Sequence, residues 1–171
     1  APGRCITIEA IQAALKKCNF FNVYNKKNEL QSQGTFDLDD NQESCDLFYP
    51  FIEHCFKYIR ENCLEEWNKG DKEDGMLTIN RGIHGVIRVI DDIVNMLVEK
   101  EMINPKTQEV EDMFGLISYY LKPLTTYISV LEAEQRKEIK KVFGGGGDIR
   151  FWRAYQKAIA EARPDFKPDG L

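Results

Sequence analysis

The chain has 171 residues, of which 43% are hydrophobic and 30% charged. This composition excludes a disordered or collagen-like chain, and the length provides one domain with a sizeable core. The formal net charge of −5 argues against a protein that binds phosphates over its whole surface. We therefore expect a single domain over residues 1–171, with any anion-binding surface confined to a local patch. Residues 131–171 carry nine Lys and Arg against seven Asp and Glu, so this segment is the first place to look.

The sequence predicts no membrane contact, no metal and no cofactor. No run of about 18 apolar residues occurs, and the first residues lack a signal-peptide pattern. Five cysteines without a C-x-x-C motif indicate reduced thiols in the cytoplasm, with Cys18, Cys55 and Cys63 as small core residues. Because His54 and His84 are the only histidines, a zinc site is not expected.

The first half of the chain is predicted to hold three helices and one long loop. Apolar spacing favours a helix over residues 7–17, and polar residues with Gly34 and several aspartates then predict a polar loop over 19–43. A helix with an aromatic-rich stripe is expected over residues 44–67. After a charged turn, the strongest apolar face of the chain predicts a helix over residues 77–100, with Thr78 as its N-cap.

The second half is predicted to be helical as well. Residues 110–121 and 124–131 are expected to form a helix that is interrupted at Pro123, where the proline ring forces a kink or a break. A short charged helix over 132–143 follows, and Asp148 is expected to cap a last helix over 149–162. Strand-type alternation is weak everywhere, so the predicted fold is an all-α, single-domain bundle of about six helices.

A glycine run before the last helix is the first candidate binding site. It consists of Gly144, Gly145, Gly146 and Gly147, and Arg150 and Arg153 follow it three residues apart on the helix. Glycines let backbone N–H groups converge, and a helix N-terminus favours an anion, so the segment predicts a phosphate or nucleic-acid contact with Trp152 available for stacking. The alternative is a plain helix–helix connector, and the Gly-Lys-Ser/Thr of a P-loop is missing.

A polar stripe on the helix over residues 77–100 is the second candidate. Arg81, His84 and Arg88 stand at positions i, i+3 and i+7 and share one face. Gly82 and Gly85 between them allow close approach, either of a ligand or of another helix. The alternative is a solvated or salt-bridged face, for which neighbouring carboxylates are available as partners.

Catalysis is not expected from this sequence. Adjacent carboxylates on a helix point about 100° apart, so Asp91 and Asp92 do not form an acid–base dyad by spacing alone. No serine lies in a G-x-S-x-G motif, and Cys55 cannot face the neighbouring His54 on a helix.

Two stretches carry a resemblance to a known family. Residues 77–92, preceded by a helix ending in Glu66-Trp67, and residues 142–171, with their glycine run and Pro-Asp-Phe tail, resemble the C-terminal helical region of bacterial DGQHR-motif proteins. The resemblance covers about residues 45–171, and the family includes proteins associated with DNA phosphorothioation, a bacterial defence system. The DGQHR motif itself lies in an N-terminal domain of the ParB nuclease or DNA-binding type, and it is absent here.

The resemblance implies a C-terminal fragment that acts as a non-catalytic accessory domain of a DNA-associated protein. Its expected partners are DNA, the missing N-terminal domain or a second copy of the chain. The alternative, which the acidic balance favours, is a protein-interaction or oligomerisation domain with no role in nucleic-acid binding. A small helical nuclease or toxin is a third hypothesis, but it needs a histidine or carboxylate cluster that the spacing does not supply.

Overall fold

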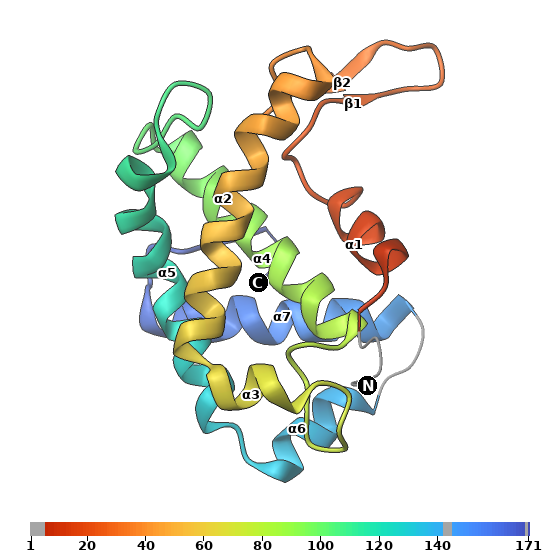
Figure 1. The fold of residues 1–171 in the computed structure, drawn as a ribbon, viewed down its shortest axis with the longest axis vertical. Coiled ribbons are helices and arrows are strands. Elements are labelled where there is room, and N and C mark those ends of the chain that lie inside the picture. Colours follow the sequence, from red (N-terminus) through yellow and green to blue (C-terminus); the bar gives the residue numbers. More distant parts are fainter. Residues whose placement is uncertain (1–5, 142–144, 170) are drawn as a thin grey trace.

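The fold was analysed in a computed structural model, which describes residues 6–141, 145–169 and 171 (Figure 1). These residues form seven helices and one two-stranded antiparallel ribbon, which confirms the predicted all-α class. The elements in chain order are α1 (Ile8–Leu15), β1 (Val23–Tyr24), β2 (Leu30–Ser32), α2 (Asn41–Asn62), α3 (Leu64–Lys69), α4 (Asn80–Glu99), α5 (Val110–Val130), α6 (Ala133–Lys140) and α7 (Gly145–Ala162).

Helix α4 is the centre of the bundle. It packs against α1, α5 and α7, and α2 lies against α5. Helix α7 runs across α4 (Figure 1). Most of its side chains are buried, including Ile90 and Ile93, which are fully covered. The helix starts at Asn80 with Ile79 as N-cap, because Thr78 donates its hydroxyl to the carbonyl of Trp67 instead of capping the helix.

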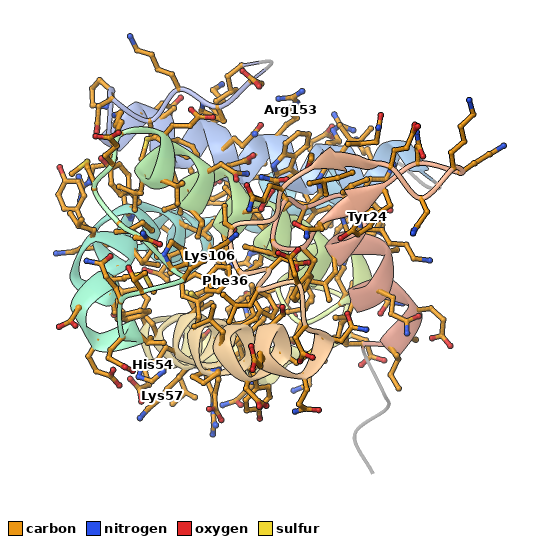
Figure 2. All side chains as sticks on the ribbon, turned by 90° about the horizontal axis from the view of Figure 1, so that it is seen from above. Tyr24, Phe36, His54, Lys57, Lys106 and Arg153 are labelled. Atoms are coloured by element: carbon orange, nitrogen blue, oxygen red, sulfur yellow. The ribbon has the colours of Figure 1, made fainter. Side chains whose placement is uncertain are left out.

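The predicted polar loop over residues 19–43 is wrong in part. It contains the β1–β2 ribbon, whose turn is closed by Asn25: its side-chain oxygen accepts hydrogen bonds from the backbone N–H groups of Lys27 and Glu29. Phe20 and Phe36 flank the ribbon and are fully buried against aromatic side chains of α2, and Figure 2 shows Phe36 inside the molecule. These aromatic residues at both ends of a polar segment anchor it to the core.

Of the kink or break predicted at Pro123, the break is wrong, because α5 runs through the proline. A proline in a helix removes one N–H donor and leaves the carbonyl four residues earlier without its partner. That carbonyl, of Tyr119, accepts a hydrogen bond of 3.2 Å from the Nε of Arg163, beyond the end of α7. Leu121 and Leu124 on either side of the proline are fully buried, so tertiary packing holds the helix continuous.

Several predicted helix boundaries also move. The helix expected over residues 44–67 is two helices, α2 and α3, which meet at Cys63. Helix α6 is shorter than predicted and begins with a capping box between Glu132 and Gln135. Helix α7 begins at Gly145 and not after Asp148, so Asp148 lies within its first turn. Cys18, Cys55 and Cys63 are buried, as predicted.

A buried ion pair that the sequence analysis did not anticipate joins α3 to α6. Glu66 and Arg136 are 3% and 5% exposed and form a charge-assisted hydrogen bond. Glu66 also accepts from the backbone N–H groups of Met76 and Leu77, and Arg136 also donates to three backbone carbonyls. Because both charged groups have several hydrogen-bond partners, the pair holds α3 against α6 at the lower end of the bundle in Figure 1.

Candidate binding site

The structure divides the predicted stripe of α4 into a buried part and an open part. His84 is 4% exposed, and its Nδ1 has no hydrogen-bond partner. Burial is the main cause that lowers its pKa below the ordinary 6.5, so the imidazole is neutral near pH 7. Arg81 lies over the Phe151 ring and donates to the carbonyl of Lys140 at 3.2 Å. Arg81 therefore contributes to the packing of α4 against α6 and α7, and His84 is a buried side chain of the same helix.

The glycine run supplies the start of α7. Gly145, Gly146 and Gly147 belong to the first turn of the helix, and Gly144 lies outside the described residues. The two arginines that follow diverge in their surroundings. Arg150 is exposed near α6, where it adds to the lowering of the pKa of Glu138, which is caused mainly by Lys141. Arg153 lies on the outer side of α7 (Figure 2).

Arg88 and Arg153 converge on one aromatic ring, that of Trp152. The guanidinium carbons lie over the ring at 3.5 Å and 4.4 Å from its centroid. Stacking of this kind contributes about 0.5–2 kcal/mol per pair. The sequence placed these three side chains on two separate helices, and the close packing of α4 on α7 brings them together. We refer to them as the Arg88–Trp152–Arg153 cluster.

A chain of hydrogen bonds fixes the orientation of the Trp152 ring. Its Nε1 donates to Asp92 at 2.6 Å, and the same carboxylate oxygen accepts from Gln156 at 2.8 Å. Gln156 is fully buried, and its amide oxygen accepts from Arg153 at 2.9 Å. Burial raises the pKa of Asp92, while the hydrogen bonds from Trp152 and Gln156 oppose this rise. The ring and one of its two guanidinium groups are thus held in place before any ligand arrives.

Beside the cluster lies a cavity of about 560 Å³, which we call the tail cavity because the C-terminal segment forms one wall. Lys17, Arg88, Lys100 and Lys167 contribute positive charge to it. In the described part of the chain, Arg88 makes no hydrogen bond, and no carboxylate oxygen lies within 4.0 Å of its guanidinium. Burial is the main cause that lowers its pKa, so a charged, half-buried group faces the cavity without an acceptor.

The carboxylates of the tail cavity are mostly engaged in other contacts. Asp165 accepts hydrogen bonds from Tyr120 and Lys100. Asp91 accepts from the backbone N–H of Asn19 at 2.9 Å, and burial raises its pKa to about 7, so its charge is reduced at neutral pH. Asp165 keeps its negative charge, because the hydrogen bond from Tyr120 lowers its pKa, and Glu99 and Asp169 line the same cavity.

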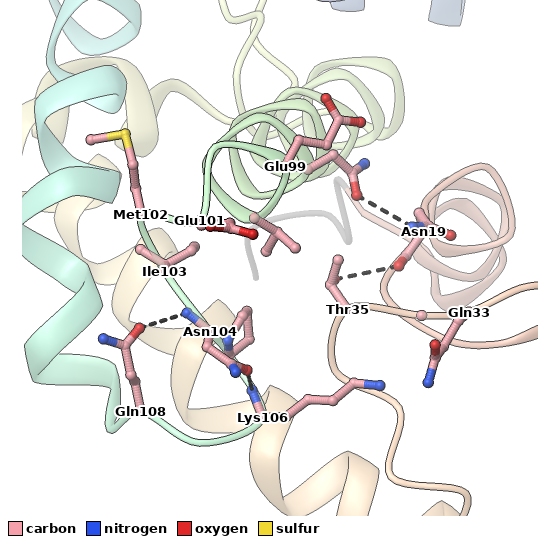
Figure 3. A pocket seen from close by; sticks show the side chains of 14 residues that line it. Asn19, Gln33, Thr35, Glu99, Glu101, Met102, Ile103, Asn104, Lys106 and Gln108 are labelled. Atoms are coloured by element: carbon pink, nitrogen blue, oxygen red, sulfur yellow. Dashed lines mark hydrogen bonds between the residues drawn. The ribbon is translucent and has the colours of Figure 1, made fainter.

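A second cavity, of about 620 Å³, adjoins the first and shares Asn19, Asn95 and Glu99 with it. Its walls are the C-terminal end of α4, the segment after β2 and the α4–α5 connection (Figure 3). We call it the amide cavity because Asn and Gln side chains dominate its polar lining, with Val98, Ile103 and Pro105 as apolar parts.

Several residues of these cavities carry no signal in the sequence. Asp92 stands four residues after Arg88, a spacing typical of an ion pair on one helix, yet its carboxylate accepts from Trp152 and Gln156 of α7 instead. Asn19 and Lys167 come from distant segments, and only the tertiary structure places them at the site.

The described residues hold neither a candidate metal site nor a candidate membrane span. Within them, no three His, Cys, Asp or Glu side chains form a group that could hold a metal ion. Nor is any of the described helices long and apolar enough to cross a membrane.

Comparison of the chain with family models, curated proteins and solved structures finds no match. The resemblance to DGQHR-motif proteins therefore stays a prediction from the sequence motifs.

Proposed function

We propose that the chain is a non-catalytic accessory domain of a bacterial DNA-associated protein of the DGQHR type, located in the cytoplasm. In this proposal the Arg88–Trp152–Arg153 cluster makes a local contact with single-stranded nucleic acid. The observation that supports it is the Arg88 guanidinium, which is stacked on Trp152 and has no acceptor in the described part of the chain.

The chemistry of this group suits a phosphodiester. A guanidinium offers five N–H donors in a planar fork, and a phosphate oxygen accepts them with charge assistance. A base can stack on an aromatic ring or on a guanidinium plane, which is the usual way that single strands are bound. Lys17 and Lys167 line the same cavity and supply two further cations for the phosphates of a strand. The net charge of −5 keeps the contact local.

The proposal is tested by fluorescence anisotropy with labelled single-stranded DNA and RNA at two salt concentrations. We expect Arg88→Ala to weaken binding by about tenfold, because a hydrogen bond to a charged group is worth about 1.5–3 kcal/mol. The slope of log K against log salt is expected to fall by about 0.7 for each lost phosphate contact. Arg150→Ala is the matched control, since Arg150 lies on α7 but lines neither cavity.

The results separate this function from a structural role of the cluster. Melting curves show whether Arg88→Ala is folded. Equal affinities of the Arg88 and Arg150 variants, or no binding by the native chain at low salt, would rule out the proposed contact.

A protein-interaction role is the second candidate, and the β1–β2 ribbon favours it. Val23, Tyr24 and Leu30 are 44–51% exposed on a ribbon whose outer edges pair with no other described strand. Free strand edges with apolar side chains are common docking elements for another chain. In this role the proposed partner is a second copy of the chain or the N-terminal domain of a DGQHR-type protein.

Light scattering tests this second role through the dependence of mass on concentration. Self-association that Tyr24→Lys abolishes would support it. Tyr49→Lys on α2 is the control, because Tyr49 is 64% exposed away from the ribbon. A constant monomer mass, together with no binding to the N-terminal domain, would exclude it.

A further inference from the structure

The amide cavity is lined by hydrogen-bond donors and acceptors that have no partner in the described part of the chain. The oxygens of Asn104 and Gln108 accept from backbone N–H groups, of Lys106 at 3.2 Å and of Asn104 at 2.6 Å. Their NH₂ groups, and the amide of Gln33, donate to no acceptor within the described ranges. The same cavity holds the carboxylate of Glu99, which has no hydrogen-bond or ion-pair partner there.

These groups stand on different walls of the cavity. Glu99 comes from α4, Gln33 from the segment after β2, and Asn104 and Gln108 from the α4–α5 connection (Figure 3). Residues with acceptors and residues with donors thus border the space on several sides. A ligand that uses all of them must itself carry both donors and acceptors on its edge.

The charge of the cavity argues against a phosphate. Glu99 and Glu101 line it against a single lysine, Lys106, and none of its residues is an arginine that could bind a phosphate with two hydrogen bonds. Val98, Ile103 and Pro105 provide apolar surface for the face of a flat ring. The volume of about 620 Å³ is within the range of small-ligand sites, about 300–1,000 Å³. The fitting ligand is therefore a neutral, planar, polar heterocycle.

We infer that the amide cavity is a base-recognition subsite that prefers bases with an exocyclic amino group; this inference rests on the proposed nucleic-acid contact. The shared wall of Asn19, Asn95 and Glu99 places the subsite next to the cavity that receives the phosphate. The Glu99 carboxylate accepts from the exocyclic amino group, as carboxylates do with cytosine. The amide NH₂ groups donate to ring nitrogens or carbonyl oxygens of the same base.

The preference has a definite direction. Adenine, cytosine and guanine carry an exocyclic amino group, whereas thymine and uracil present carbonyl oxygens that a carboxylate repels. A good pair of base contacts is worth about 1–3 kcal/mol of discrimination, so we expect adenine and cytosine oligomers to bind about tenfold more tightly than thymine oligomers.

The test measures the affinity ratio between deoxyadenosine or deoxycytidine oligomers and thymidine oligomers of equal length by fluorescence anisotropy. Glu99→Gln and Gln33→Ala are both expected to bring the ratio close to one. Both side chains are exposed and make no hydrogen bond within the described part of the chain, so the fold is expected to persist. Glu109→Gln is the control, because it removes the same charge in the α4–α5 connection outside both cavities.

The outcomes separate this inference from the proposed function. Binding with equal affinity for all oligomers would overturn the base subsite but leave the phosphate contact standing. A preference that survives in both variants would show that the base is read elsewhere, which also overturns the subsite. Loss of all binding in the native chain would overturn both.

Discussion

Replacing Gly82 by alanine tests how tightly α4 packs against the segment before it. A β-carbon at this position would lie 2.0 Å from the carbonyl oxygen of Met76 and 2.4 Å from that of Leu77. Both atoms belong to the backbone, so the segment must shift to admit a methyl group. Overpacking of this kind costs up to about 3 kcal/mol.

Gly115 on α5 is the matched control for this substitution. A β-carbon there would meet no atom within 4 Å, so alanine brings only its better helix propensity, about 1 kcal/mol over glycine. We therefore expect Gly115→Ala to raise the free energy of unfolding by about 1 kcal/mol. The same gain offsets part of the cost at Gly82, where we expect a net loss of about 2 kcal/mol.

The assay is thermal unfolding followed by circular dichroism. For a chain of this size, 1 kcal/mol shifts the melting temperature by about 2–4 °C. The melting temperature is expected to rise by about 2–4 °C for Gly115→Ala and to fall by about 4–8 °C for Gly82→Ala. If Gly82→Ala melts at or above the native temperature, the close approach of α4 to Met76 and Leu77 is refuted.

Three further changes probe the core. A β-carbon at Gly85 would lie 3.0 Å from the backbone nitrogen of Trp152, so Gly85→Leu is expected to lower the melting temperature strongly; an unchanged value would place this glycine away from α7. Arg136→Met leaves the buried Glu66 without its main cation and is expected to cost about 3 kcal/mol in urea unfolding, and a loss below about 1 kcal/mol would contradict the buried pair. The pKa of Asp91 is raised from 3.8 to about 7, so the folded state holds its proton more tightly and stability should fall as pH rises from about 4 to 7. Asp91→Asn is expected to flatten this pH profile, and an equally steep profile in that variant would assign the effect to other groups.

The candidate site shows how far local sequence patterns reach. The positions of Arg88 and Arg153 on helices followed from their spacing, and Trp152 was identified as a stacking group. That both guanidinium groups stack on the same ring depends on the packing of α4 against α7, which no local pattern encodes. Burial of His84 was equally inaccessible, because a helix face becomes buried only when another element covers it.

The sequence by itself determined the helical class, the approximate helices and the buried cysteines, because apolar spacing along the chain is a local property. It failed at Pro123, where the buried Leu121 and Leu124 and the hydrogen bond from Arg163 outweigh the local cost of proline. It also missed the ribbon at residues 23–32, which is held to the core by distant aromatic contacts. Only the tertiary structure decided which charged side chains are buried, which have no partner and which cavities they line. Contacts between distant segments determine both burial and hydrogen bonding.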